Sequence, residues 1–460
     1  MRRTLIRRTA AILIVVLVFA QMAQAAYGYH VELEAAAADE AEGPDTLTLW
    51  YTDEKLNAYL VEAASEFEAQ YDVEITLQLV TAVDYIEHIN TASTTDNGGP
   101  DLFVVSSELL EKARLAGLTV ENDSFTEEEL EEYFPVQALN AATCGDKLEA
   151  YPFYFETCFL LYNKDYIDEV PSSIDDILEY AENFEGDDTT ASVENIFKWN
   201  VGDIFSNFFF IANYVNLGGE TGDDASQVEL DADEVVACLE YYQSLNAYFA
   251  IDEEEVTTDS VLEEFIEGKT VFTIAKTDAI ATIDAAIAEA EAAAAAEAQE
   301  EESEETSEEE TEEETEEETE EETDGETTDD DGYFYGISEV PDLTDELKTK
   351  GLSVTNSIAV NAYSGEKELA KAFAVYLTVD KADSLYAMSG KMPVSLEVEY
   401  ENDEMEVLID QYENSVEVTK LTDLSNYWIE MEITFANIWS GNDVQEEVDD
   451  VTARIMSQLD

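Results

Sequence analysis

The chain has 460 residues, 45% of them apolar, and this length exceeds what a single compact core normally holds, so we expect two or more domains. It carries 110 acidic and 20 basic residues, a formal net charge of −90. Such a balance excludes ordinary nucleic-acid binding, which needs cationic groups that displace counterions, and it disfavours adsorption to anionic lipid.

The first 25 residues predict a secretory signal peptide. Four arginines precede an apolar run over residues 10–20, and Ala23-Gln24-Ala25 fits a cleavage site. The run is short for a membrane span, although an uncleaved amino-terminal anchor remains an alternative. Residues 26–45 lack periodicity and predict a flexible tether. We therefore expect a secreted protein, or one held at the extracellular face of the cell membrane.

From residue 46 onward, strand patterns alternate with helical patterns. We expect strands over 47–51, 73–80, 101–105, 159–163, 270–274, 336–341 and 352–361. We expect helices over 55–71, 85–93, 108–116, 174–184, 232–247, 366–377, 424–439 and 444–459. This alternation is typical of βαβ units, so the predicted fold class is α/β with mostly parallel sheets.

Two other features are local. Residues 285–331 form an acidic low-complexity insert, which begins with a strongly helical composition and continues with a Thr-Glu-Glu-Glu repeat. Like charges at a four-residue spacing disfavour a helix, so we expect a solvated loop.

The odd number of cysteines leaves at least one unpaired. A Cys144–Cys158 bridge is conceivable, but Cys158 and Cys238 lie in apolar patterns that favour buried thiols.

Three segments join an apolar run to a polar turn and a helical pattern: Leu47–Lys55, Gly99–Leu118 and Glu149–Ile167. In this order and spacing they resemble the extracellular solute-binding proteins of sugar ABC importers, the maltose-binding-protein-like group. The resemblance continues at Gly268–Ile283, Leu352–Ala374, Gly390–Val394 and Trp428–Arg454.

The resemblance implies a type II periplasmic-binding-protein-like fold, in which two lobes close around a solute by hinge motion. It implies interlobe crossings near Tyr154–Glu156, Val354–Ser357 and Tyr412–Val416. It also implies a monomer that delivers its solute to the permease subunits of an ABC transporter. The expected division is residues 46–154 and 353–412 in lobe 1, and residues 155–352 and 413–460, with the insert, in lobe 2.

The family's motifs place the ligand-binding residues. After the first strand they fall on Asp53, Glu54 and Lys55, and after the third strand on Ser107 and Glu108. Tyr154 and Glu156 match the turn at the first crossing, and an aromatic residue of the second lobe matches Phe208 or Phe209, of which we take Phe208. Asp278, Tyr427 and Trp428 complete the expected set.

The chain also departs from the family's pattern. A stacking Trp of the family falls on Thr277-Asp278, another on Val104 or Val105, and a basic contact on Glu432. These losses suit a smaller ligand, and also a cationic solute such as a polyamine or amino sugar held by carboxylates. A sensory protein that passes its ligand to a membrane kinase is a further alternative.

Catalysis finds little support. The sequence has no nucleophile-elbow motif and no phosphate-binding glycine loop, and two histidines cannot form a zinc cluster. We expect no enzyme, no cofactor and no metal.

Overall fold

The computed structural model describes residues 45–459 except 96–97, 168, 188–189, 291, 293–333, 401 and 403. The predicted signal peptide, nearly all of the predicted tether and most of the acidic insert lie outside these residues. Among the described residues, no helix is long and apolar enough to cross a membrane.

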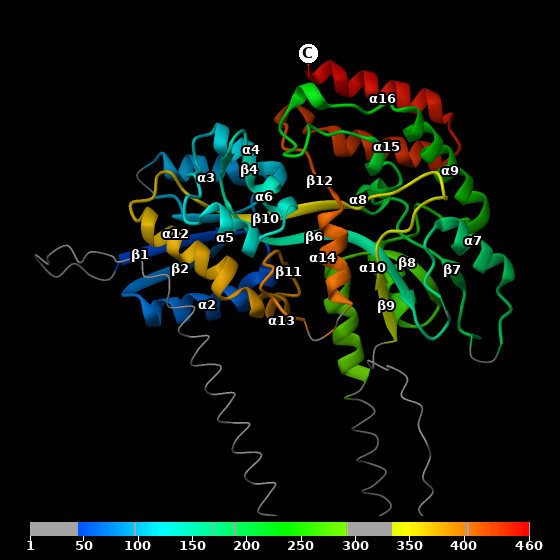
Figure 1. The fold of residues 1–460 in the computed structure, drawn as a ribbon, viewed down its shortest axis with the longest axis horizontal. Coiled ribbons are helices and arrows are strands. Elements are labelled where there is room, and N and C mark those ends of the chain that lie inside the picture. Colours follow the sequence, from blue (N-terminus) through cyan, green and yellow to red (C-terminus); the bar gives the residue numbers. More distant parts are fainter. Residues whose placement is uncertain are drawn as a thin grey trace, which may run out of the picture. The chain divides into compact units, whose positions relative to one another are not determined.

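Ten strands of the described chain form one mixed sheet, with the central order β2-β1-β3-β10-β6-β8-β7. The strands β2, β1 and β3 are parallel, as are β7 and β8, which accords with the expected βαβ units. The long strands β10 and β6 are antiparallel to their neighbours in this order (Figure 1). The bounds are β1 Asp45–Tyr51, β2 Val73–Leu79, β3 Leu102–Ser106, β6 Tyr151–Asn163, β7 Asn195–Phe197, β8 Thr270–Lys276, β9 Tyr335–Ser338, β10 Leu352–Val360, β11 Met392–Pro393 and β12 Val416–Glu417.

The predicted helices all form, with small shifts at their ends. The helix expected over 55–71 begins with a 3-10 turn, η2 (Glu54–Leu56), and continues as α2. The helix expected over 366–377 forms as α12, which continues directly into the π-helical turn η6 (Tyr376–Asp380). The matching helices are α2 Asn57–Gln70, α3 Tyr85–Ser93, α4 Ser107–Leu115, α7 Ile174–Asn183, α9 Asp233–Phe249, α12 Lys367–Val375, α15 Tyr427–Trp439 and α16 Val444–Leu459.

The structure also contains helices that we did not predict. They are short; α5 and α10 begin with capping boxes, at Thr126–Glu129 and Thr257–Ser260, whereas α6, α13 and α14 begin without a side-chain cap. Those used below are α5 Glu127–Tyr133, α6 Val136–Ala142, α10 Thr258–Ile266, α13 Leu385–Ser389 and α14 Met405–Glu413. A further helix follows β8 over 278–290, where the start of the acidic insert was expected to be helical.

The strand β6 is much longer than the expected strand over 159–163. It begins at Tyr151 and is buried along nearly its whole length. Its first half pairs with β10 and its second half with β8 and β9. The register with β10 shifts between Asn356 and Ser357, opposite Pro152, whose nitrogen has no hydrogen to donate. A single strand therefore runs through the first expected crossing.

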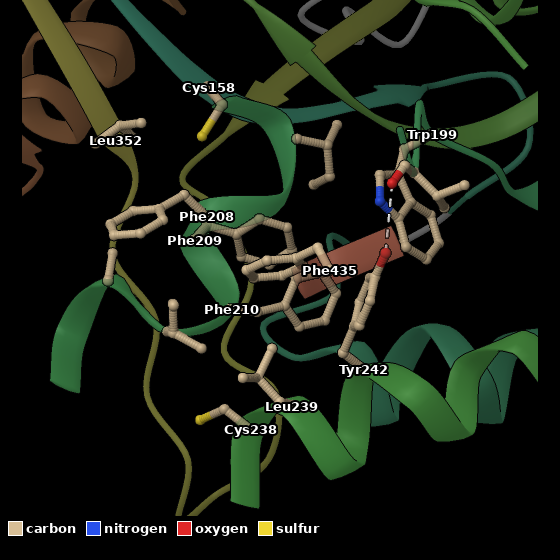
Figure 2. Packing of buried hydrophobic residues seen from close by; sticks show 14 of the residues in the cluster. Cys158, Trp199, Phe208, Phe209, Phe210, Cys238, Leu239, Tyr242, Leu352 and Phe435 are labelled. Carbon is tan, nitrogen blue, oxygen red and sulfur yellow. Dashed lines mark hydrogen bonds between the residues drawn. The ribbon is translucent and has the colours of Figure 1, made fainter. Parts of the chain in front are cut away.

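Separate apolar cores pack on the two halves of β6. One core joins β1 and α2 to α12, with Tyr59, Phe67 and Phe373 among its buried side chains. Another joins α9 and α15, where Trp199, Tyr242 and Phe435 pack together (Figure 2). A third cluster includes Phe155 and Tyr412, whose rings stack with centroids 4.2 Å apart. The two larger cores thus contact different halves of β6, and the expected division into two lobes stays a prediction.

The three cysteines lie in the described chain and are free and buried. Burial raises the pKa of Cys144 to about 11 and that of Cys158 to about 12. The conceivable Cys144–Cys158 bridge is therefore not formed, and the apolar patterns around Cys158 and Cys238 predicted this outcome.

Candidate functional site

Five charged side chains lie together near the carboxyl ends of β1 and β8 and the middle of β6. We call them the charged row: Asp53, Lys55, Glu156, Asp278 and Lys391. The ammonium of Lys391 lies 2.8 Å from Asp53 Oδ2 and 2.9 Å from Glu156 Oε1. The ammonium of Lys55 lies 3.4 Å from Asp278 Oδ2. Acidic and basic groups thus alternate along the row.

Local structure fixes each member of the row. Asp53 caps η2, because its Oδ1 accepts a hydrogen bond from the backbone N–H of Lys55 at 2.9 Å. Asp278 begins the helix after β8, and the N–H of Thr277 donates to Thr157 O at 3.1 Å, next to Glu156 on β6. Lys391 follows Gly390, which ends α13 with a φ of +68°. Four separate segments therefore converge here.

Lys391 is the central cation of the row. Its side chain is 5% exposed, and burial alone would lower its pKa, but the carboxylates of Glu156 and Asp53 outweigh burial and raise the pKa. Burial likewise pushes the pKa of Asp53 upward, and the hydrogen bonds from Lys391 and from the N–H of Lys55 reverse this and lower it. Lys391 is therefore an ammonium and Asp53 a carboxylate at neutral pH.

Lys391 was not among the predicted site residues. The segment Gly390–Val394 matched the family as a whole, but its motif marks no ligand contact. The available signal was the scarcity of bases, because a lysine in so acidic a chain is expected to have an acidic partner.

The row keeps polar atoms open to a solute. The side chains of Asp53 and Glu156 are 26% and 35% exposed, and those of Asp278 and Lys55 are 43% and 49% exposed. A second pair flanks the row, with Lys276 Nζ 3.3 Å from Asp203 Oδ2. The arrangement can therefore offer acceptors and donors to one ligand at several points.

An open groove of about 700 Å³ continues from Lys55. It lies between α13 and the helix over 278–290, and Tyr386 and Asp284 line it from these two sides. The Tyr386 hydroxyl donates to Asp284 Oδ2 at 2.8 Å, and the Tyr335 hydroxyl donates to Asp284 Oδ1 at 2.7 Å. The groove therefore has an aromatic side chain held by hydrogen bonding in its wall.

The two ligand-binding residues expected on α4, Ser107 and Glu108, differ in their surroundings. Ser107 is buried, and its hydroxyl donates to Glu417 Oε1 at 2.5 Å, so it already has a partner within the protein. Glu108 lies in the first turn of α4 and is exposed, although nearby protein atoms partly desolvate its carboxylate and raise its pKa. Glu54 on η2, also of the expected set, is exposed, and so is Glu432 on α15, which stands where the family has a basic contact.

The expected aromatic residues differ in accessibility. Phe208 and Tyr427 are fully buried, and Figure 2 shows Phe208 beside Phe209 and Phe210 in the apolar core. Tyr154 is 3% exposed, and its ring centroid lies 5.4 Å from Lys391 Nζ. Trp428 is half-buried, with ring centroids 5.1 Å from Phe208 and 5.0 Å from Tyr427. Of these aromatic residues, Trp428 offers the most surface to a solute.

The structure thus brings Asp53, Lys55, Glu156 and Asp278 of the expected set into one cluster. Ser107, Phe208 and Tyr427 instead make contacts inside the protein. Contact of a solute with any residue of the expected set stays a prediction. Among the described residues, no group of three or more His, Cys, Asp or Glu side chains is arranged to hold a metal ion.

Sequence relatives point to solute binding. Residues 62–407 match the family described as bacterial extracellular solute-binding proteins. A maltotriose-binding protein of Pyrococcus abyssi is 25% identical over 235 residues, which is 50% of this chain and 49% of that protein. A maltooligosaccharide ABC transporter solute-binding lipoprotein of Streptococcus pneumoniae is 23% identical over 237 residues, 48% of this chain and 52% of that protein. The chain therefore spans about half the length of these curated relatives.

Solved structures establish the fold. The extracellular solute-binding protein of Staphylococcus aureus in complex with maltose matches with a TM-score of 0.71 at 18% identity, over 91% of this chain and 99% of that chain. The maltotriose-binding protein of Thermus thermophilus matches with a TM-score of 0.64 at 18% identity, over 90% of this chain and all of that chain (100%). This chain has the type II periplasmic-binding-protein fold, and it belongs to the family of bacterial extracellular solute-binding proteins.

Proposed function

We propose that the protein captures a sugar or oligosaccharide outside the cell and delivers it to the permease subunits of an ABC importer. The charged row carries this proposal. A sugar hydroxyl both donates and accepts hydrogen bonds, so a row in which carboxylates alternate with ammonium groups can satisfy several hydroxyls of one ring. Because Lys55 and Lys391 balance most of the carboxylate charge, the row suits an uncharged, hydroxyl-rich ligand.

The groove next to Lys55 supports a ligand of more than one sugar unit. Its volume of about 700 Å³ lies within the range of small-molecule sites. Tyr386 in its wall and the half-buried Trp428 of α15 are aromatic side chains, and aromatic rings provide faces that can stack on the apolar side of a sugar ring. The names of the relatives, which bind maltotriose or maltooligosaccharides, agree with this ligand class.

A cationic solute is the second candidate. The charged row has three carboxylates and two ammonium groups, and Glu108 and Glu432 could add negative charge. A polyamine or amino sugar would compete with Lys391 for Asp53 and Glu156. This competition requires that an internal ion pair be broken, so we place the neutral sugar first.

The remaining parts of the proposal concern the cellular setting. Export depends on the signal peptide over residues 1–25, and residues 26–45 then serve as a tether. The protein acts as a monomer and closes its lobes around the solute. It performs no catalysis, because capture and release require only reversible binding.

Thermal unfolding against a ligand panel tests this function. The panel contains maltose, maltotriose, maltotetraose, glucosamine and spermidine, because a ligand that binds only the folded state raises the melting temperature. We expect a maltooligosaccharide to raise it clearly in the wild type and by less, at the same concentration, in Glu156→Gln. Glu121→Gln, which removes the partner of Lys147 in an exposed pair, is the matched control and should respond like the wild type. A response to spermidine alone would favour the second candidate, and no response to any sugar would contradict the first.

A further inference from the structure

Glu417 on β12 is an acceptor for many donors. Its carboxylate accepts five hydrogen bonds from residues that the structure describes. Oε1 accepts from Ser107 Oγ at 2.5 Å and from the backbone N–H of Thr355 at 2.7 Å. Oε2 accepts from Ser353 Oγ at 2.9 Å, Thr355 Oγ1 at 3.0 Å and Gln137 Nε2 at 3.3 Å. An ionised carboxylate only accepts hydrogen bonds, so five donors around Glu417 favour its charged form.

The donors come from three elements that are distant in sequence. Ser107 begins α4, Gln137 lies in the first turn of α6, and Ser353 and Thr355 lie on β10. In the proposed division all of these elements belong to lobe 1, whereas Glu417 belongs to the last segment of lobe 2. One side chain of lobe 2 is thus bonded to three parts of lobe 1.

Lys420, three residues further on, makes a complementary set of contacts. The residue is fully buried, and its ammonium donates to Asn140 O at 2.6 Å, Thr143 O at 2.8 Å and Thr221 O at 2.5 Å. The first two carbonyls lie at the end of α6 in lobe 1, and Thr221 lies in lobe 2. The backbone N–H of Lys420 also donates to Gly222 O at 2.9 Å. Lys420 therefore connects both lobes to the third crossing.

Other titratable groups face this pair. Burial raises the pKa of Glu417, and Lys420 works against that rise. Burial lowers the pKa of Lys420, and Cys144, Glu417, Asp223 and Glu111 oppose that change. Tyr412 on α14 shares a hydrogen bond with Thr355 Oγ1. Lys420 is fully buried and Glu417 half-buried, and hydrogen bonds are their main partners, so loss of either charge would leave several donors or acceptors without a partner.

We propose that Glu417 and Lys420 are positioning residues, which fix how the two lobes meet and thereby set the affinity for solute without touching it. This inference rests on the proposed capture function. Its physical basis is that a ligand held by both lobes gains affinity when its binding geometry is already populated. The contacts of the pair lie on α4, α6, β10 and the loop around Thr221, and none of them involves a member of the charged row.

The test compares variants of the full chain. Glu417→Gln keeps the shape of the side chain but removes its charge and replaces one acceptor with a donor, and Ser107→Ala removes one of the five donors. The matched control is Ser364→Ala, which removes a hydroxyl–carboxylate bond to Asp101 of 2.6 Å within lobe 1. The readouts are the radius of gyration of the ligand-free protein in solution scattering and the Kd for maltotriose by calorimetry.

We expect Glu417→Gln to change the ligand-free radius of gyration and to shift the Kd about tenfold, within the usual range of coupling between sites. Ser107→Ala should act in the same direction with a smaller effect, and it should add less in the Glu417→Gln background than in the wild type, because the bond is already weakened there. Ser364→Ala should change neither readout. If Glu417→Gln does not fold, the ligand-free radius of gyration of Ser107→Ala decides, because Ser107 is also a predicted ligand contact and its Kd would not separate the two roles.

An unchanged radius of gyration and an unchanged Kd, even with a lower melting temperature, would overturn the proposal and leave Glu417 with a role in stability alone. If maltotriose does not bind the wild type, the proposed ligand is wrong, but scattering of the ligand-free variants still decides whether the pair positions the lobes. The two failures are therefore distinguishable.

Discussion

The ammonium of Lys391 lies 2.9 Å from the carboxylate of Glu156, although 235 positions of the chain separate them. The same ammonium is bonded to Asp53 at 2.8 Å. One lysine thus holds together the turn after β1, the first crossing on β6 and the end of α13. Because both carboxylates keep part of their surface open, the lysine orders these acids without removing them from solvent.

Removal of this lysine should destabilise the fold. Lys391→Met leaves two adjacent carboxylates without their counter-charge, so we expect the free energy of unfolding to fall by about 1–3 kcal/mol, below the full value for a buried pair because both acids are partly exposed. Unfolding in urea measures this change in the free energy of unfolding. Lys147→Met, in an exposed pair with Glu121, is the control and should change stability by less than about 0.5 kcal/mol. Equal losses in both variants would contradict a special role for Lys391.

Two substitutions test the binding surface. Glu156→Gln removes a charged acceptor, and Trp428→Ala removes the half-buried ring, so each should weaken sugar binding by about 1–3 kcal/mol while the fold stays intact. Calorimetry gives the affinity, and far-ultraviolet circular dichroism checks the fold. Unchanged affinity in both variants would assign these residues to structure alone.

The pH dependence of stability should report on Asp53. Its pKa is lowered in the folded protein, so the unfolded chain binds the proton more tightly and the contribution of Asp53 to stability is present above the ordinary value of about 3.9. The contribution is lost as the pH falls through the lowered folded value. Asp53→Asn should therefore be less stable at neutral pH and should lose less stability between about pH 4 and pH 2 than the wild type. Parallel curves for the two proteins in urea titrations would contradict this assignment.

The thiols should be inert in the native protein. All three cysteines lie in the described chain and are buried, and burial raises their pKa values, to about 11 for Cys144. Because the thiolate is the reactive form, iodoacetamide at about pH 8 should modify none of them until the protein is unfolded, when all three should react. Mass spectrometry counts the modified sites. Rapid labelling of Cys144 in native buffer would show that its strand opens readily.

The acidic insert should be dispensable for folding and binding. Its repeat has almost no apolar side chain, so it cannot offset the entropy of ordering. Replacement of Glu300–Asp330 by a short Gly/Ser linker should leave the melting temperature and the sugar affinity nearly unchanged. A deletion that unfolds the protein or abolishes binding in vitro would show that the insert has another role.

The regular elements were predictable because their signals are local. Apolar residues at helical spacing predicted α3 and α16 with their observed bounds. Gly117, with a φ of +71°, lies just after α4, where the predicted helix over 108–116 ends. The length of β6 was not predictable, because Tyr151 and Pro152 read as a turn and only pairing with β10 extends the strand to them.

The site was partly predictable for the same reason. Asp53, Lys55 and Asp278 follow strand patterns, and Glu156 lies in the turn that matches the family at the first crossing, so the resemblance located all four. Lys391 and Glu417 act through partners that are far away in the sequence, and no local pattern marks such a contact. Ser107 fits the motif for a ligand contact, but its hydroxyl is already bonded to Glu417, which a local pattern does not reveal.

Calorimetric titration of the full chain with maltotriose tests the central claim most directly, with Asp53→Asn and Glu156→Gln measured beside the wild type. The account predicts saturable binding to the wild type and an affinity at least about tenfold weaker in each variant, which corresponds to about 1.4 kcal/mol. Saturable binding of equal affinity in all three proteins would contradict the claim that the charged row holds the sugar.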